Sequence, residues 1–276
     1  MTLQEALLQG TSLLKEGGIA VPRLTSEALL CHALRQERSF LYAHPERELC
    51  EVEWIHYGRY LHERLKGKPT QYITGRQEFY GREFRVGPDV LIPRPETELV
   101  IETAVELGAG ARRILDVGCG SGAIAVTLQL EMGAKVCATD LSAPALLVAS
   151  ENSRRLGAAV QFVVCDLVSA IADHSIDLLA SNPPYVPLGD RAGLQREVRD
   201  YEPEIALFAG PSGFELYQRL IEDAVRVLRP DGWLVLELGY NSRDRVLEML
   251  GPLWRDVRVM PDLAGIPRVL AARMNP

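Results

Sequence analysis

Short apolar runs alternate with longer helical patterns from about residue 112 to the end of the chain. The runs are apolar enough to be buried, and helix-like segments, including Ser142–Leu156 and Glu215–Leu228, fill the gaps between them. This alternation predicts an α/β fold with a doubly wound, mainly parallel sheet. The predicted strands are Arg113–Asp116, Lys135–Thr139, Val160–Cys165, Ile176–Ala180, Trp233–Leu238, Asp256–Met260 and Arg268–Arg273.

The first 66 residues follow a helical pattern instead. Thr2 and Glu5 have the spacing of a capping box, and the pair Gly17-Gly18 ends the first apolar stretch. We therefore expect a small helical N-terminal domain over residues 1–66, whose size suits partner docking. Its further helices are predicted at Arg23–Leu34, Ser39–Ala43 and Val52–Leu65.

Glycine and proline punctuate residues 67–95, which we interpret as a connector. Glu78–Val86 has the pattern of a β-hairpin with its turn near Gly81. Two prolines then flank Arg94 in the loop that leads to a helix at Leu99–Leu107. Such a loop is placed to cover a ligand pocket, although a plain linker has the same spacing. The α/β domain is predicted over residues 96–276.

A glycine motif follows the first predicted strand of the sheet. Gly118, Gly120 and Gly122 are spaced by two, with Cys119 and Ser121 between them. Glycines at such a turn permit unusual backbone angles and let a ligand approach the main chain. The spacing differs from the dinucleotide-binding fingerprint. It is similar to motif I of class I S-adenosylmethionine (AdoMet) methyltransferases, and the alternative is a turn that binds nothing.

Acidic residues end the next two predicted strands, at Asp140 and Asp166. Ligands of open α/β sheets lie beyond the carboxyl ends of the strands. A carboxylate at the first position can accept both hydroxyls of a ribose, and one at the second can reach an adenine amino group. The alternative for Asp166 is a solvated turn residue.

The run Asn182-Pro183-Pro184-Tyr185 directly follows the fourth predicted strand. The Asn side-chain oxygen and a main-chain carbonyl can each accept one N–H bond, while the prolines fix the carbonyl directions and donate nothing. Tyr185 offers a flat face to a planar group. This combination suits the binding of a planar amino group, whose delocalised lone pair must be localised before it can attack. A proline-rich turn without a ligand is the alternative.

Composition narrows the class of protein. Of 276 residues, 47% are hydrophobic and 24% charged, as in an ordinary globular protein, and the formal net charge is −7. This balance argues against general nucleic-acid binding, although it leaves room for a local basic patch. The five cysteines form no Cys-x-x-Cys pair, and the five histidines have no metal-ligand spacing with them. We expect a metal-free, cytoplasmic protein without a membrane span.

The motifs together resemble the release-factor glutamine methyltransferase family (PrmC/HemK) over essentially the full length. The supporting segments are Gly75–Gly81, the Ile-Pro-Arg-Pro-Glu-Thr-Glu loop at Ile92–Glu98, the Asp-Val-Gly-Cys-Gly-Ser-Gly and Ser-Asn-Pro-Pro-Tyr-Val motifs, Tyr201–Pro203 and Ala206–Gly210. Asn-Pro-Pro-Tyr alone is shared with enzymes that methylate adenine, so the Pro-Arg-Pro-Glu-Thr loop is the more specific feature.

The resemblance implies methyl transfer from AdoMet to the side-chain amide of glutamine in the Gly-Gly-Gln motif of class 1 peptide-chain release factors. It implies a class I methyltransferase domain and a release factor as partner. Asn182, Pro183 and Tyr185 would be catalytic, and Pro184 would join them in binding the substrate. The implied cofactor-binding residues are Gly118, Cys119, Gly120, Ser121, Gly122, Asp140, Asp166, Leu167, Asn182, Arg94 and Glu98.

One position departs from some relatives, which carry an aromatic residue where this chain has Leu167. The chain therefore has no aromatic ring at this position to stack on adenine. Two other functions share the fold: amino-methylation of adenine or guanine in DNA or RNA, and a non-catalytic adaptor. The acidic balance and the lack of an added target-recognition domain argue against the first, and the presence of the glycines, Asp140 and Asn182 argues against the second. We expect a monomer.

Overall fold

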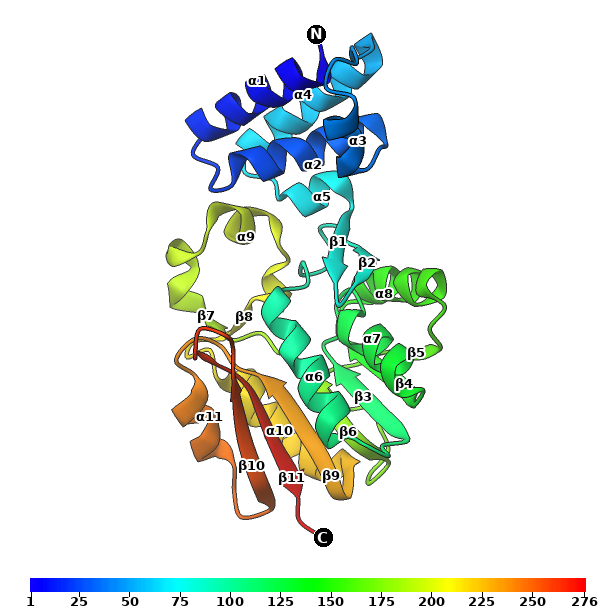
Figure 1. Cartoon of the computed structure of the whole chain (residues 1–276). Helices are drawn as coiled ribbons and strands as arrows, with labels where there is room; N and C mark the ends of the chain where they lie inside the picture. Colours follow the sequence, from blue (N-terminus) through cyan, green and yellow to red (C-terminus); the bar gives the residue numbers. More distant parts are fainter. The chain divides into compact units, whose positions relative to one another are not determined.

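A computed structural model describes all residues, 1–276, and divides them into two compact units. The helical unit contains Met1–Arg76 and Gln195–Tyr201. The sheet unit contains Gln77–Leu194 and Glu202–Pro276. The predicted fold class is confirmed, because a mainly parallel sheet is combined with an N-terminal helical region and a hairpin connector (Figure 1).

Six helices form the helical unit. Thr2 and Glu5 make the predicted capping box, with the Thr2 hydroxyl accepting from the Glu5 amide and the Glu5 carboxylate accepting from the Thr2 amide. Leucines and Tyr57 fill the core between the first, second and fourth helices. The helices are α1 (Leu3–Glu16), α2 (Pro22–Leu34), α3 (Arg38–Ala43), α4 (Glu51–Leu65), α5 (Thr70–Thr74) and α9 (Arg196–Tyr201).

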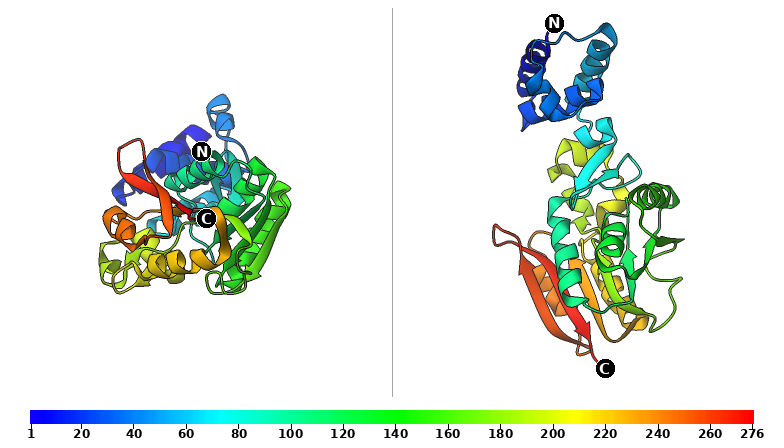
Figure 2. Two further views of the ribbon diagram at one scale, coloured as in Figure 1. Left: turned by 90° about the horizontal axis from the view of Figure 1, so that it is seen from below. Right: turned by 45° about the vertical axis from the view of Figure 1, so that its right-hand side comes forward.

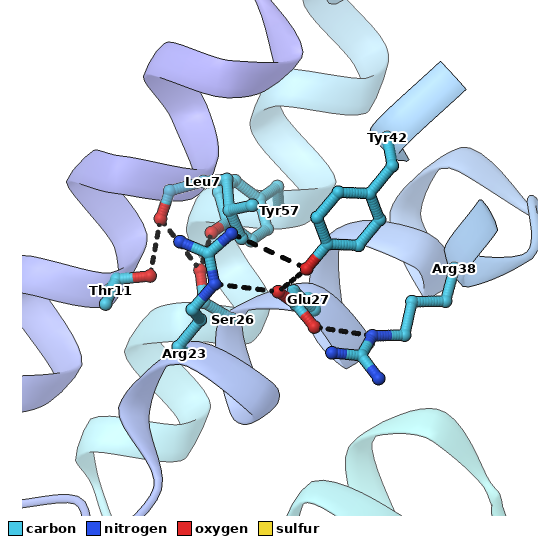
Figure 3. Close-up of polar contacts among 8 residues, drawn as sticks. All are labelled: Leu7, Thr11, Arg23, Ser26, Glu27, Arg38, Tyr42 and Tyr57. Atoms are coloured by element: carbon cyan, nitrogen blue, oxygen red, sulfur yellow. Dashed lines mark hydrogen bonds and ion pairs between the residues drawn. The ribbon is translucent and has the colours of Figure 1, made fainter. Parts of the chain in front are cut away.

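A buried carboxylate ties α2 to α3 (Figure 3). Glu27 accepts hydrogen bonds from the Arg38 Nε at 2.7 Å and from the Tyr42 hydroxyl at 2.5 Å, and Arg23 approaches it at 3.0 Å. Burial alone would raise the pKa of Glu27, but these partners outweigh it and lower the pKa. The carboxylate therefore remains charged and holds the two helices together.

The sheet unit is built on seven strands in the order β10-β11-β9-β6-β3-β4-β5. The five strands from β9 to β5 are parallel, and β11 and β10 are added antiparallel at one edge, where Figure 2 shows them in red and orange. The strands are β3 (Arg113–Val117), β4 (Lys135–Asp140), β5 (Val160–Val164), β6 (Ile176–Ser181), β9 (Leu228–Glu237), β10 (Trp254–Pro261) and β11 (Pro267–Met274).

The predicted strands all exist, and their bounds differ by a few residues. The largest difference is in β9, which begins at Leu228 rather than at Trp233. Pro230-Asp231-Gly232 is a turn-forming sequence, and β9 passes through it with a register shift against β6. The local sequence therefore concealed the first half of this strand.

Helices cover both faces of the sheet. Side chains alternate along each strand, so Ile114 packs with α6, α7 and α8 on one face and Leu115 with α10 and α11 on the other. In Figure 1, α6 crosses in front of the sheet. These helices are α6 (Glu98–Leu107), α7 (Ala123–Met132), α8 (Ala143–Leu156), α10 (Glu215–Val227) and α11 (Arg243–Met249).

Smaller elements complete the unit. The predicted hairpin is present, and Tyr80 and Gly81 turn it with positive φ angles of 51° and 67°. No helix of the structure has both the length and the apolar character needed to cross a membrane. The remaining elements are β1 (Arg76–Phe79), β2 (Arg82–Arg85), β7 (Val186–Pro187), β8 (Phe208–Gly210), and the 3₁₀ turns η1 (Pro95–Thr97), η2 (Leu188–Gly193) and η3 (Glu204–Ala206).

The close packing of α1 against α4 predicts a specific sensitivity at Gly10. A Cβ there would overlap the Tyr57 hydroxyl and lie 2.8 Å from the Ser26 Oγ, and these two groups are hydrogen-bonded to each other at 2.6 Å. We expect Gly10→Ala to lower the free energy of unfolding by about 1–3 kcal/mol, measured by chemical denaturation.

Gly58→Ala is the matched control, because a Cβ at Gly58 meets nothing within 4 Å inside α4. The helix propensity of alanine should make it neutral or stabilising by about 0.5–1 kcal/mol. Equal losses in both variants would contradict the packing argument.

Candidate active site

A pocket lies at the carboxyl ends of the parallel strands of the sheet unit. Strand order reverses at β3, which pairs with β4 on one side and β6 on the other. Such a switch point is where open α/β sheets bind ligands. The predicted residues that line the pocket are Gly118, Gly120, Asp140, Asp166, Leu167, Asn182 and Pro184, joined by others from the segments at 89–91 and 203–206.

The glycine loop after β3 turns back against the end of β4. The amides of Gly118 and Cys119 donate to the Thr139 carbonyl at 2.8 and 3.0 Å. Gly118 and Gly120 have φ angles of 72° and 52°, which favour glycine. A Cβ at either position would meet no protein atom within 4 Å. The missing side chains therefore leave pocket space open beside the main chain.

Asp140 fixes this loop. Its Oδ2 accepts from the Gly120 amide and its Oδ1 from the Ser142 amide, each at 2.8 Å. Each carboxylate oxygen retains acceptor capacity after one such bond. Asp140 can therefore hold the loop and still accept hydrogen bonds from a ligand in the pocket.

Three further residues of the glycine motif support the loop from within the protein. Cys119 and Ser121 are buried, and the Ser121 carbonyl accepts from Asn152 Nδ2 at 3.0 Å. Gly122 caps α7, and a Cβ there would lie 3.1 Å from the Ala149 Cβ. None of the three lines the pocket.

Asp166 and Leu167 form the side of the pocket next to β5. The Asp166 carboxylate is half exposed and accepts from Arg219 at 2.7 Å. Leu167 has a φ of 48°, an uncommon conformation for a branched side chain. An aliphatic side chain in a bent loop therefore borders the pocket here.

The Asn-Pro-Pro-Tyr segment begins directly after β6. The Asn182 Nδ2 donates to the Thr97 hydroxyl at 3.2 Å. Pro184 lines the pocket with Asn182, whereas Tyr185 is directed toward Gly239, where a Cβ would lie 2.7 Å from its ring. Burial raises the pKa of Tyr185 to about 12, so the phenol stays protonated at neutral pH.

Arg94 and Glu98 are held by other parts of the sheet unit and do not line the pocket. Arg94 Nη2 donates to both oxygens of the buried Glu202 carboxylate, at 2.7 and 2.8 Å. Glu98 Oε1 accepts from the Tyr80 amide at 2.7 Å. These contacts anchor the loop at Ile92–Glu98, which carries Thr97 to Asn182.

Two buried carboxylates near the site were missed by the sequence reasoning. Asp116 is fully buried, and its Oδ2 accepts from the Ala125 amide at 2.9 Å while its Oδ1 has no partner. Glu237 is 3% exposed and accepts from the Thr97 hydroxyl at 2.6 Å. Burial raises their pKa values to about 8 and about 7. The signal for Glu237 was a lone charge within the apolar run Leu234–Leu238.

No group of three or more His, Cys, Asp or Glu side chains lies where it could hold a metal ion. The arrangement instead offers a main-chain cradle, a carboxylate and an oriented amide around one pocket. That set can bind a polar organic ligand and position a second, planar group beside it.

The chain is similar to known proteins in both sequence and structure. Residues 5–75 match the family model of the PrmC N-terminal domain, and residues 95–194 match that of the methyltransferase small domain. A release factor glutamine methyltransferase of Koribacter versatilis is 45% identical over 99% of both chains. One from Bacillus subtilis is 38% identical, covering 99% of this chain and 98% of its own.

Solved structures share the fold at low identity. A methyltransferase from Pyrococcus furiosus superposes with a TM-score of 0.56 at 17% identity, over 79% of this chain and all of its own. The T. thermophilus 16S rRNA N2 G1207 methyltransferase, solved with AdoMet and guanosine, gives 0.52 at 21% identity, over 72% of this chain and 50% of its own. These likenesses show the class I methyltransferase fold.

Burial of Asp116 predicts a pH dependence of stability. The folded-state pKa lies near 8, above the ordinary value of 3.8 for an Asp side chain, so ionisation of the unfolded chain removes stability as pH rises from about 4 to 8. Between pH 5 and pH 8, we expect the wild type to lose about 2–4 kcal/mol more unfolding free energy than Asp116→Asn.

Asp177→Asn is the control for this measurement. The pKa of Asp177 is lowered, since its hydrogen bonds from Arg112, Arg113 and Arg229 outweigh burial, and its contribution to stability is complete above pH 5. Its removal should shift stability by the same amount at both pH values. Parallel pH slopes for the wild type and Asp116→Asn would show that Asp116 is ionised in the folded protein.

Proposed function

The chain belongs to the release factor glutamine methyltransferase family, and we propose that it methylates class 1 peptide-chain release factors. The methyl group passes from AdoMet to the side-chain amide nitrogen, N5, of the glutamine in their Gly-Gly-Gln motif. The orientation of Asn182 carries the proposal. Its Nδ2 donates to Thr97, which leaves Oδ1 as the acceptor for a ligand, and Asn182 lines the pocket.

The pocket residues fit AdoMet. The open space at Gly118 and Gly120 suits the methionine end, with Gly122 and the intervening Cys119 and Ser121 shaping the turn. Asp140 retains acceptor capacity for the ribose hydroxyls. Asp166 or the main chain at Leu167 would face the adenine, with the Leu167 side chain giving apolar contact in place of aromatic stacking. When bound, AdoMet supplies an electrophilic methyl group on a sulfonium.

The protein's part in the chemistry is positioning. The amide NH₂ of the substrate glutamine donates to Asn182 Oδ1 and to the Pro183 carbonyl, which localises the nitrogen lone pair and aims it into the pocket. Pro184 adds no competing N–H, and Tyr185 packs behind the loop. AdoMet, held at the glycine loop and Asp140, would supply the methyl group, and the same two acceptors would stabilise the positive charge that develops on nitrogen. The proton then leaves to water.

The other parts of the chain have proposed roles as well. Residues 1–66 would dock the release factor, residues 67–95 would connect, and residues 96–276 would bind AdoMet. Arg94 and Glu98 would close the site indirectly, by anchoring the loop that holds Thr97. We propose that the protein acts as a monomer in the cytoplasm, because its substrate participates in translation there.

Radiolabelled AdoMet tests the substrate. We would offer the purified protein a release factor, the same factor with its motif Gln changed to Ala, and duplex and single-stranded DNA and RNA. Label should enter the intact factor alone. Label in nucleic acid alone would establish the alternative, amino-methylation of a nucleobase, and refute the glutamine assignment.

Replacement of Asn182 should separate binding from turnover. In Asn182→Ala, the substrate amide loses one acceptor, and we expect kcat to fall about 100-fold or more while AdoMet affinity, measured by calorimetry, is retained. Pro183→Ala is the milder comparison, because the carbonyl survives and only its rigidity is lost. Loss of AdoMet binding in parallel with turnover would argue that Asn182 serves the cofactor rather than the acceptor.

A further inference from the structure

The side chains of Asn182, Thr97 and Glu237 form a chain of hydrogen bonds that ends in a buried carboxylate. Thr97 is 4% exposed and lies in η1, and Glu237 is 3% exposed at the end of β9. The Thr97 Oγ1 lies 2.6 Å from Glu237 Oε2 and 3.2 Å from Asn182 Nδ2. The carboxylate in the apolar strand β9 is therefore linked to Asn182 through a single hydroxyl.

We propose that Glu237 is a positioning residue, which acts through the Thr97 hydroxyl to fix the orientation of the Asn182 side-chain amide. The inference rests on the proposed role of Asn182 in methyl transfer. Glu237 is not among the residues that line the pocket, so it would act without touching substrate or AdoMet.

We call the hydrogen-bonded chain of Asn182, Thr97 and Glu237 the relay. The number of hydrogens on each group decides which group donates to which. A hydroxyl has one hydrogen, and an ionised carboxylate accepts only. Thr97 therefore donates its hydrogen to Glu237, and its lone pairs remain for Asn182. Asn182 must then present its NH₂ group to Thr97, and Oδ1 is directed the other way. Reversal of the amide would place two donors, Asn182 Nδ2 and the substrate NH₂, against each other.

The surroundings of Glu237 are mixed in charge. Burial raises its pKa to about 7, the Thr97 hydroxyl lowers it, Glu96 raises it, and Arg268 and Arg94 lower it. Both arginines have carboxylate partners of their own, Asp262 at 2.9 Å and Glu202 at 2.7 Å. The Thr97 hydroxyl, rather than either arginine, therefore donates to the Glu237 carboxylate.

Aromatic groups complete the enclosure. From α10, the Tyr217 hydroxyl donates to the main-chain carbonyl of Glu237 at 2.8 Å, and the Tyr185 phenol lies close by. Burial keeps both phenols protonated at neutral pH, because it raises the pKa of Tyr185 to about 12 and that of Tyr217 further. The carboxyl group of Glu237 is therefore the member of the chain that titrates near neutrality.

Protonation of Glu237 reverses the relay. A neutral carboxyl group can donate to Thr97, and the Thr97 hydrogen is then free to donate to Asn182, which favours the reversed amide. The productive orientation is thus present above the pKa of Glu237 and is lost as pH falls through it.

Methylation kinetics test the relay with variants matched in shape. Thr97→Val replaces the hydroxyl by a methyl group, and we expect kcat to fall about 10- to 100-fold with AdoMet affinity unchanged. Thr97→Ser restores the hydroxyl and should return kcat to within about threefold of the wild type. Thr103→Val removes another buried hydroxyl, from a residue that is 3% exposed and lies outside the relay, and should leave kcat unchanged.

The pH profile identifies Glu237. Wild-type kcat should decrease as the pH drops below about 7. In Glu237→Gln this acidic limb of the pH profile should be absent, because the amide does not titrate. Full activity of Thr97→Val, or an unaltered limb in Glu237→Gln, would overturn the proposal.

Nuclear magnetic resonance of the free protein separates this inference from the proposed function. The Asn182 side-chain NH₂ signal, assigned by its absence in Asn182→Asp, should titrate near pH 7 in the wild type and not in Thr97→Val. A titrating signal supports the relay even if the release factor takes up no label, and an invariant signal refutes the relay even if the release factor is methylated.

Discussion

The parallel registration of β4, β3 and β6 is the constraint on which the site depends. Val117 pairs with Thr139 on one neighbouring strand and with Ser181 on the other, so all three strands end at one edge. Gly118, Asp140 and Asn182 directly follow these three paired residues in the sequence. Residues far apart in the sequence therefore surround one pocket. A slip in this pairing would separate the ligand-binding groups without changing any of them.

Two buried carboxyl side chains lie near the same edge of the sheet. Asp116 at β3 and Glu237 at β9 are enclosed by apolar layers, and desolvation raises the pKa of each. Burial of an apolar residue at either position would cost less free energy. Carboxylates persist there because they organise polar neighbours: Asp116 holds the start of α7 through Ala125, and Glu237 holds the hydroxyl of Thr97. Buried carboxyl groups behind the pocket thus orient neighbouring polar groups.

The two units show different uses of buried charge. In the helical unit, Glu27 remains ionised because two arginines and a tyrosine surround it, and its effect is to join helices (Figure 3). In the sheet unit, Glu237 has a single hydroxyl donor to its carboxylate and no direct cation, so its proton is exchangeable near neutral pH. Structural stability favours the first arrangement, and an adjustable orientation at a reactive site favours the second.

The sequence by itself determined the order of strands and helices, the glycine turn, and the identity of the amide-binding motif, because alternating polarity, missing side chains and functional groups are properties of neighbouring residues. It also indicated the family through those motifs. It left β9 half recognised, since its turn-forming residues concealed the strand. Only the tertiary structure decided that Cys119 and Ser121 are directed inward, that Asp140 holds the loop, and that Thr97 meets Glu237 across 140 positions of sequence. Such contacts depend on strand register and packing between layers, which exist only after the sheet has assembled.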